Sequence, residues 1–597
     1  MLVYGDVECI ETVRDKRQTI ETRLDQVNAL PPGSERHAAL IAAFIGTSEL
    51  VQALIDSDFE ARGFDALSPI HISGMECLSL LAQSIVQSWQ SGLSDFALPE
   101  AFRDKLLSFD PDQTIRTKQA EGYAFYALYP ESYVEAATRS GLDPDTQVIG
   151  IRSIGSGLSA LVAAALGTRP VLTLRPAGHP FQREVKVDPA FTAMLPQEPD
   201  ATFAIVDEGP GLSGSSFGAV ADWLEASGIS RERIHFFPSH AGQLGPQAGS
   251  GHRERWDSAS RHFVSMDQLL CDGERNHLRR WVEDIVGPLE EDLQDISGGA
   301  WRALRYRDPA LWPAANIQQE RRKFLARTSG ATWLVKFAGL GENGLRKYAL
   351  ARKLHQAGFT PEVAGYRHGF LVERWHGEAS SPDQHPIARD RLVSRIGAYL
   401  GFRARHFPAQ AHQGASRAEL CEMALHNTRL ALGEQAHVTL RHALQNVDHL
   451  YGVANRVFTD NRMHSWEWIL DDGRMIKADA LDHCATHDLV GCQDITWDIA
   501  GAAVEFGLSD QDTRHLCDVV QEESARPVSL ALLSFLLPCY LAFQLGAHTM
   551  ATDMLKGNEE EDRLRLAARR YGALLQSCLR RRDRLGFDEE LDKVPAG

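Results

Sequence analysis

The stretch FAIVDEGPGLSGSSF (203–217) places two acids directly before a loop of glycines and serines. Neighbouring carboxylates accept hydrogen bonds from hydroxyl groups, and the vicinal hydroxyls of a sugar suit such a pair. Glycines permit close backbone approach, while backbone N–H groups and serine hydroxyls at a helix N-terminus bind phosphate. A ribose 5-phosphate satisfies both halves, with its diol on Asp207 and Glu208. The alternative is an ordinary glycine-rich turn beside a solvated acid pair.

A buried strand must hold these acids, and a helix must follow the loop. The run TFAIVD is apolar up to its acid, as expected of a central parallel strand covered on both faces. Apolar residues between Phe217 and Leu224 fall on one helical face, and Gly228 provides the stop. The pattern predicts a strand, a phosphate-binding loop and a helix.

A second segment of the same kind, VIGIRSIGSGLSALVAAALG (148–167), comes about 55 residues before the acid pair. Its apolar residues from Leu158 onward form a buried stripe, and Gly167 ends the helix. We expect its turn to cradle a second anion, because it combines a cation with hydroxyls and glycines: Arg152, Ser153, Gly155 and Ser156.

The strand, acid pair, short spacer, Ser-Gly pair and helix resemble the ribose-phosphate signature of type I phosphoribosyltransferases, over about residues 115–270. The resemblance implies that Asp207 and Glu208 hold the ribose hydroxyls. It implies a 5-phosphate loop made of Ser213, Gly214, Ser215 and Ser216. It also implies that the turn beginning at Arg152 binds the pyrophosphate of phosphoribosyl pyrophosphate (PRPP). The chain departs from the signature in spacer length and in carrying serine where threonine is usual.

The segment LRPAGHPFQREVKV (174–187) lies between the two loops and carries Arg175, His179, Arg183 and Lys186. Members of the family have a mobile basic segment here that closes over the pyrophosphate, which implies a catalytic role for Arg183. The implied reaction is displacement at the anomeric carbon of PRPP, with Mg²⁺ assisting departure of pyrophosphate. A solvated surface loop is the alternative.

The second half shows a lysine on an apolar strand in ATWLVKF (331–337), followed by a helix that ends at Gly358. The order of elements, the strand GFLVERWHGE (369–378) and the segment ITWDIAGA (495–502) resemble small-molecule kinases of the aminoglycoside phosphotransferase type. The resemblance implies a two-lobed kinase-like domain and an ATP site, with these candidate residues: Lys336, Glu373, Asp479 and Asp482.

The catalytic loop departs from that family. Its His-Gly-Asp start and the asparagine five residues after the aspartate have no counterpart in TDNRMHSWEWILDDGRMIKADALDHCATHDLVGCQD (459–494), and Arg346 and Lys347 replace a partner glutamate. Asp479 or Asp482 is expected to bind the metal, and His464 or Glu467 to act as the base. His483, His487 and Asp488 are further potential ligands. The alternative is a scaffold whose polar residues only satisfy one another.

We therefore predict an α/β protein with a parallel-sheet phosphoribosyltransferase domain, a two-lobed kinase-like α+β domain and a helical N-terminal region. The expected boundaries are 1–112 for the helical region, 113–272 for the first domain, 273–300 for a helical linker and 301–597 for the kinase-like domain. A length of 597 residues agrees with several domains.

Composition narrows the function classes. The formal net charge of −18 argues against a nucleic-acid-binding surface, and nine cysteines without CxxC pairing argue against a zinc ribbon or disulfide framework. The run PVSLALLSFLLPCYLAFQLGA (527–547) approaches the length of a membrane span, but Pro538 and Gln544 interrupt it, so buried core helices are expected. We expect a cytoplasmic protein with no membrane or nucleic-acid partner.

Three hypotheses follow. The first is a Mg²⁺- and PRPP-dependent phosphoribosyltransferase for an unidentified acceptor, fused to a divergent phosphotransferase-like domain that uses ATP, in the synthesis or salvage of a nucleotide-like metabolite. The second is a PRPP- or nucleotide-binding regulatory protein with an inactive kinase-like scaffold. A third places the chemistry in the C-terminal half alone. The sequence leaves a homodimer open.

Overall fold

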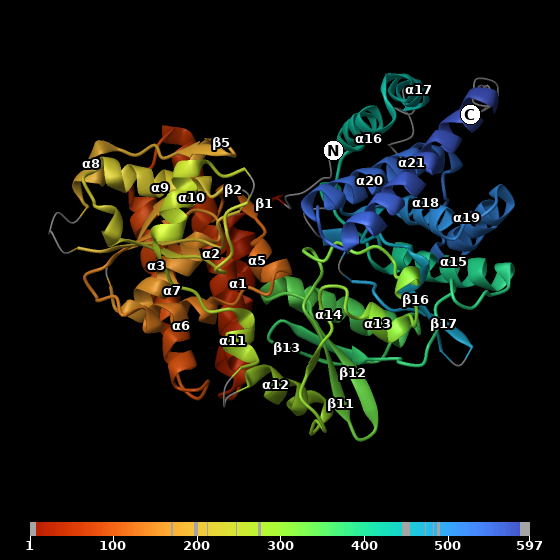
Figure 1. Cartoon of the computed structure of the whole chain (residues 1–597). Coiled ribbons are helices and arrows are strands. Elements are labelled where there is room, and N and C mark those ends of the chain that lie inside the picture. The colour runs from red at the N-terminus through yellow and green to blue at the C-terminus, as the bar shows by residue number, and fades with distance from the viewer. Residues whose placement is uncertain are drawn as a thin grey trace.

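The acid pair follows the central strand of a five-stranded parallel sheet in the computed structural model of the chain (Figure 1). The strand order is β4-β3-β7-β8-β9. The strands are β3 (Gln147–Ile151), β4 (Leu172–Leu174), β7 (Phe203–Val206), β8 (Ile234–Phe237) and β9 (Ser260–Arg261). All four residues of β7 are buried, as its unbroken apolar run predicts. The structure describes residues 8–168, 171–195, 201–211, 213–245, 247–272, 276–444, 454–471, 473–481, 483–485 and 490–585.

Helices begin directly after both predicted loops. Helix α7 (Gly155–Leu166) follows β3, and α9 (Ser215–Ala226) follows β7. The two helices cover opposite faces of the sheet, because α7 shares a hydrophobic cluster with Val148 and Val206, whereas α9 shares one with Ile149 and Ile205. This alternation along each strand is what a doubly covered parallel sheet requires.

Long helices fill the N-terminal region, as predicted. They are α1 (Val13–Ala29), α2 (Ser34–Arg62), α3 (Pro69–Gln90) and α4 (Glu100–Ser108). Strand β1 (Glu8–Thr12) pairs with β2 (Thr114–Lys118), and α2 and α3 pack on α7. Further helices of this half are α5 (Glu121–Phe125), α6 (Pro130–Ser140), α8 (Pro189–Ala193), α10 (Ser250–Ser258) and α11 (Met266–Leu270).

The basic segment predicted to cover the pyrophosphate forms a hairpin of β5 (Ala177–His179) and β6 (Gln182–Glu184). Helix α12 (His277–Val286) then leads to a second sheet, which is antiparallel with the order β10-β11-β12-β14-β13. Its strands are β10 (Gln294–Asp295), β11 (Lys323–Thr328), β12 (Ala331–Phe337), β13 (Val363–Arg367) and β14 (Phe370–Arg374). Helix α14 (Gly341–Gln356) joins β12 to β13, in the order of elements expected of a kinase-like first lobe.

A mainly helical lobe completes the chain (Figure 1, blue-green to blue). Its helices are α15 (Arg389–His406), α16 (Arg417–Leu432), α17 (Glu434–Leu444), α18 (Thr496–Glu505), α19 (Asp510–Ser524), α20 (Leu530–Met554) and α21 (Glu560–Leu585). A short α13 (Arg302–Arg305) precedes the second sheet's long strands. Short antiparallel pairs lie in this lobe, β15 (Arg456–Val457) with β18 (Gln493–Asp494) and β16 (Trp468–Asp471) with β17 (Arg474–Lys477).

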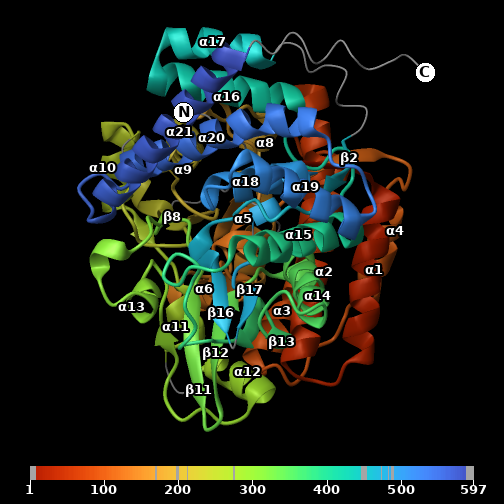
Figure 2. The same cartoon turned by 90° about the vertical axis from the view of Figure 1, so that its right-hand side faces the viewer.

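The two halves share one hydrophobic core. The cluster that contains the N-terminal helices also contains Phe324, Val335 and Phe370 of the antiparallel sheet. A hydrogen bond crosses the same boundary, from the Tyr129 hydroxyl to the carbonyl of His368 at 2.9 Å. The second view places the antiparallel strands beneath the helical lobe (Figure 2), and β13 contacts α2. The two candidate sites therefore stand on one packed framework.

Two described helices, α2 and α20, are long and apolar enough to cross a membrane. Their apolar windows are 89% and 72% buried inside the protein, as in core helices. The expectation of buried core at 527–547 agrees with this packing, but Pro538 lies inside a single continuous helix instead of breaking the run.

Candidate functional site

A cavity of about 290 Å³ opens at the carboxyl ends of β3 and β7 and gathers most of the predicted phosphoribosyl site. Parallel strands end at the same edge of a sheet, so loops far apart in sequence meet there. The cavity is lined by residues from both predicted loops and from the basic segment, together with the first residue of α5: Arg152, Ser153, Arg175, Arg183, Asp207, Glu208, Ser216 and Glu121.

Asp207 and Glu208 both line this cavity as adjacent buried carboxylates. Burial raises the pKa of Asp207 to about 7, although Arg175 and Arg183 act in the opposite direction. Burial and then the neighbouring Asp207 raise the pKa of Glu208 to about 8. Two carboxylates held this closely without a full set of cations favour binding of hydroxyl donors or a divalent cation.

The backbone fixes both acids. The Glu208 N–H donates to Asp207 Oδ1 at 2.8 Å, and the Tyr133 hydroxyl donates to the Asp207 carbonyl at 2.8 Å. Glu208 lies over the start of α5, where a Cβ on Gly122 would stand 2.7 Å from Oε1. Glycine is therefore required at position 122, because any side chain there would displace the Glu208 carboxylate.

The serine loop is placed differently from the expectation. The Ser215 hydroxyl donates to the carbonyl of Pro180 at 2.7 Å, and the Ser213 hydroxyl lies 2.9 Å from Ser215 Oγ. Pro180 forms the tip of the β5–β6 hairpin, so the hairpin satisfies the hydroxyls that were predicted to bind phosphate. Of the four predicted loop residues, Ser216 lines the cavity. Gly214 adopts a φ of 64° at the N-cap of α9, which suits glycine.

The residues of the turn after β3 have different surroundings. Ser153 and Arg152 both line the cavity, but the Arg152 side chain is buried and pairs with Asp65 and, at 2.8 Å, with Asp56. Arg152 thus anchors the turn to the N-terminal helices, with its charge already balanced by two acids. Gly155 and Ser156 are buried in the first turn of α7 and are not among the described residues lining the cavity.

The hairpin contributes cations to the cavity wall. Arg183 lines it and donates to the carbonyl of Pro176 at 3.0 Å. Arg175 lines it as well, forms an ion pair with Asp56, and has its pKa lowered to about 10 by burial. His179 and Lys186 belong to the same segment but not to the described cavity lining.

A second cavity of about 250 Å³ lies between the antiparallel sheet and the helical lobe. Lys336 Nζ of β12 donates to Asp479 Oδ1 at 2.7 Å, and both residues line the cavity. Aromatic side chains also line the cavity: Tyr126, Trp301, Trp375, Trp466 and Phe543. His464, Glu467 and His483 also line the cavity, whereas Asp482, His487 and Asp488 lie outside the described residues.

Glu373, the remaining candidate for the ATP site, is buried on β14 directly opposite Leu334. Cross-strand partners share a face, so Glu373 lies on the face that carries Leu334 and Lys336. It is not among the described residues lining the cavity, in contrast to Lys336 and Asp479.

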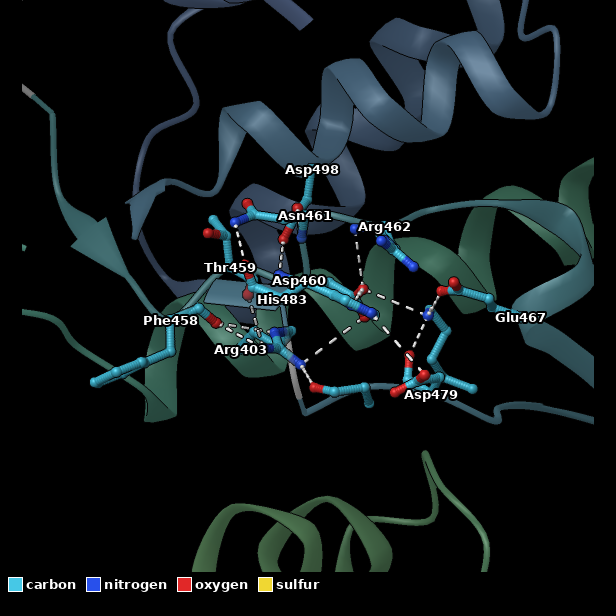
Figure 3. A network of polar contacts seen from close by, with 12 residues as sticks. Arg403, Phe458, Thr459, Asp460, Asn461, Arg462, Glu467, Asp479, His483 and Asp498 are labelled. Atoms are coloured by element: carbon cyan, nitrogen blue, oxygen red, sulfur yellow. Dashed lines mark hydrogen bonds and ion pairs between the residues drawn. The ribbon is translucent and has the colours of Figure 1, made fainter. Parts of the chain in front are cut away.

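Sequence reasoning missed Asp460, which forms the centre of a buried network behind this cavity (Figure 3). Lys477 Nζ lies 3.4 Å from Asp460 Oδ1, and Tyr399 donates to its carboxylate. Burial opposes ionisation, but Lys477, His483 and Arg403 outweigh it and hold the pKa of Asp460 well below its usual value. The signal was an acid after a short strand, in Thr459-Asp460-Asn461, where His-Gly-Asp was sought.

Asp498 of α18 holds the loop that carries Asp460. Its carboxylate accepts from the Asp460 N–H at 2.7 Å and from the Asn461 N–H at 2.8 Å. Burial and then the charge of Asp460 raise the pKa of Asp498 to about 7. The segment ITWDIAGA therefore positions the loop and does not reach the cavity.

The two cavities lie on either side of Phe125 and Tyr126, at the C-terminal end of α5. Phe125 lines the first cavity and Tyr126 lines the second, with ring centroids 6.3 Å apart. Arg321 lines the second cavity, donates to the Phe125 carbonyl at 3.0 Å and places its guanidinium 4.7 Å from the Phe125 ring centre.

No family model matches the sequence, and no curated protein matches it. Solved structures similar to the chain include a choline kinase from Streptococcus pneumoniae, at 15% identity over 43% of this chain and 89% of that chain, with a TM-score of 0.29. Spectinomycin phosphotransferase APH(9)-Ia matches at 9% identity over 50% of this chain and 97% of that chain, with a TM-score of 0.35. A thermostable mutant of aminoglycoside phosphotransferase APH(4)-Ia matches at 15% identity over 50% of this chain and 98% of its own, with a TM-score of 0.30.

None of these three structures is described as a phosphoribosyltransferase. At such identities and TM-scores the likeness assigns no activity to the chain.

Proposed function

We propose that the protein is a PRPP-dependent phosphoribosyltransferase for an unidentified acceptor. The observation that carries the proposal is the convergence of the acid pair, Ser153, Ser216 and the two hairpin arginines on one cavity at the carboxyl edge of a parallel sheet. The acid pair, the turn after β3, the serine loop and the basic segment were predicted to bind different parts of PRPP. Residues from all four line the same cavity. A glycine-rich turn with a solvated acid pair gives no reason for this convergence.

The carboxylates provide the sugar-binding half. With their raised pKa values, Asp207 and Glu208 gain most from partners that donate hydrogen bonds or carry positive charge. The ribose diol supplies the first, and Mg²⁺, for which carboxylate oxygens are suitable donors, supplies the second. Bound Mg²⁺ would neutralise charge on the pyrophosphate leaving group.

The hairpin arginines provide the leaving-group half. Arg175 and Arg183 place positive charge beside Asp207, where negative charge on the departing pyrophosphate would be stabilised. Seating a 5-phosphate requires Ser213 and Ser215 to exchange the Pro180 carbonyl for phosphate oxygens. We therefore expect the β5–β6 hairpin to move when PRPP binds.

The test is titration of PRPP with Mg²⁺, followed by measurement of pyrophosphate release with candidate bases. Wild type is expected to bind PRPP saturably, and the variant D207N/E208Q to lose binding while remaining folded. Asp222→Asn is the matched control, since this acid lies on the exposed side of α9. Absence of PRPP binding by the wild type would refute the proposal.

The regulatory alternative gives a different result with the same reagents. A PRPP-binding regulatory protein is stabilised by PRPP but releases no pyrophosphate with any acceptor. Pyrophosphate release that depends on Asp207 and Glu208 decides for the enzyme.

A second activity, phosphoryl transfer from ATP, is favoured by the Lys336–Asp479 ion pair in the aromatic-lined cavity. Lysine binds phosphate as a point charge, and a carboxylate beside it is a suitable metal donor. Asp479 would hold Mg²⁺ there, and both candidate bases, His464 and Glu467, line the cavity, although Glu467 accepts from Lys477 Nζ at 2.7 Å. ATP binding that is lost in Lys336→Met and intact in D207N/E208Q would support this activity.

A further inference from the structure

Two cysteines of the helical lobe lie together behind the second cavity. Cys484, in the short 3-10 turn His483–Ala485, and Cys492, before β18, are both buried and form a small cluster with Ala409 and Phe458. The Cys492 thiol donates a hydrogen bond to the Cys484 carbonyl oxygen at 3.6 Å, so the two side chains are neighbours in the same cluster. Both are free thiols in the structure.

A route from solvent reaches one of them. A cavity of about 270 Å³ between α14 and the C-terminal end of α15 is lined by Cys484. Its other lining residues include the cationic and ring side chains Arg346, Lys347, Lys353, His406 and Phe458. A small oxidant that enters this cavity meets Cys484 first, with Cys492 directly behind it.

The peptide units next to both cysteines hold the loop of Asp460. Asn461 Nδ2 donates to the carbonyl of His483 at 3.1 Å and to the carbonyl of Gly491 at 2.9 Å. These carbonyls belong to the residues immediately before Cys484 and Cys492. The Thr459 hydroxyl adds a bond to the Gly491 carbonyl at 3.2 Å. The backbone next to each cysteine is therefore linked to the loop that carries Asp460.

We propose that Cys484 and Cys492 form a reversible disulfide when a peroxide oxidises them, and that this disulfide loosens the Asp460 loop. Sulfur of Cys484 attacks a peroxide oxygen, the O–O bond breaks, and the first water leaves as the sulfenic acid forms. Sulfur of Cys492 then attacks Cys484, the S–S bond forms, and the second water leaves. Two thiols and one hydrogen peroxide thus give one disulfide and two waters.

The bond length explains the consequence. A disulfide brings its sulfurs to about 2 Å, which is shorter than any hydrogen-bonded thiol contact. The adjoining carbonyls of His483 and Gly491 must shift with the cysteines, and Asn461 cannot keep both bonds unchanged. The N–H groups of Asp460 and Asn461, which donate to Asp498, should then be less protected. This inference does not depend on either proposed activity.

Peptide chemistry offers a direct test in the full chain. Cleavage after Lys477 and Arg514 releases a peptide that contains Cys484 and Cys492 and no other cysteine. After hydrogen peroxide treatment and denaturing alkylation with iodoacetamide, the peptide is expected to carry no alkyl group and to weigh two hydrogens less. Dithiothreitol should restore two alkylatable thiols. Cys77 and Cys539, buried in other parts of the chain, should remain alkylatable and serve as internal controls.

Hydrogen exchange tests the link to the loop. Oxidation of wild type is expected to speed exchange at Asp460 and Asn461 by roughly tenfold or more. The Cys492→Ser variant, which keeps the size of the side chain but cannot form the bond, should show no such change. Retention of two alkylatable thiols after peroxide, or conversion of Cys484 to a sulfinic acid alone, would overturn the disulfide. Unchanged exchange in the disulfide form would overturn the loosening.

Discussion

The two cavities treat buried charge in opposite ways. In the first, burial raises the pKa of Asp207 despite two nearby arginines, and burial together with the charge of Asp207 raises the pKa of Glu208. In the second, lysine side chains already pair with the acids, Lys336 with Asp479 and Lys477 with Asp460 and Glu467. A ligand of the first cavity must bring cations or hydrogen-bond donors to the two acids. A ligand of the second cavity must replace the ion pair between Lys336 and Asp479.

The two sites also differ in how well the sequence alone predicts them, and the first is the easier to predict. Its acids, glycines and serines are contiguous, because one strand end and one helix start supply them. The second site is assembled from β12, the loop at Asp460 and the strand end at Asp479, and β12 lies more than a hundred residues before the other two. Its partners become visible only once the lobes are packed.

The largest effect is expected from neutralising the acid pair. In D207N/E208Q the diol and the metal lose both carboxylates, so pyrophosphate release should fall by on the order of 10²–10³-fold or more. A steady-state assay of pyrophosphate measures this. ATP affinity, measured in parallel, should be unchanged because the second cavity is untouched. Equal turnover in the variant and wild type would remove the acid pair from the mechanism.

Replacing the paired lysine should have the next largest effect. Lys336→Met deletes a charged hydrogen bond to Asp479 and the cation available to phosphate, so ATP affinity should drop by roughly tenfold to a hundredfold. Calorimetric titration measures the change. Lys105→Met, at an exposed ion pair with Glu76, is the control. ATP binding as tight as that of wild type would show that the Lys336–Asp479 pair is purely structural.

Sequence reasoning predicted the parallel strand, both loops and the basic segment between them, but not which side chains would face the ligand. The sequence predicted that Arg152 binds pyrophosphate, but its guanidinium forms ion pairs with Asp56 and Asp65 of the N-terminal region. Those partners come from about 90 residues earlier and carry no motif. Ser213 and Ser215 were assigned to phosphate, and the Pro180 carbonyl satisfies them here. Long-range partners, unlike strand and helix periodicity, cannot be read from local pattern.

The pH dependence of stability should separate the two regions. Folded-state pKa values of about 7 and about 8 exceed the ordinary 3.8 and 4.5, so the native state binds protons more tightly there. The acid pair's contribution to stability is complete at low pH and is lost as pH rises through 7 to 8. Wild type should therefore lose melting temperature between pH 6 and about 8.5 relative to D207N/E208Q, and Mg²⁺ with PRPP should cancel the difference.

Asp460 should act with the opposite sign. Its folded pKa lies below the ordinary value, so its contribution is present at neutral pH and is lost on acidification. Asp460→Asn should lower the melting temperature at pH 7, and do so less as pH falls below the ordinary pKa of 3.8. Parallel pH profiles for both regions in one set of variants would contradict the contrast between an uncompensated and a compensated site.

The smallest effect is expected at the shared wall. Phe125 lines the first cavity and the adjacent Tyr126 lines the second, so PRPP and ATP should change each other's affinity by the same factor, several-fold in size. Titrating each ligand in the presence of the other measures this factor. Phe125→Ala, which removes the ring between Arg321 and the first cavity, should reduce it toward one. Equal factors in wild type and variant would show that the wall transmits nothing.

The central claim is that Asp207 and Glu208 hold the ribose of PRPP. Calorimetric titration of PRPP with Mg²⁺ into wild type and D207N/E208Q tests it most directly. Saturable binding at one site per chain in wild type, and none in the folded double variant, is the predicted result. Equal affinity in both proteins, or no heat in either, would contradict the claim.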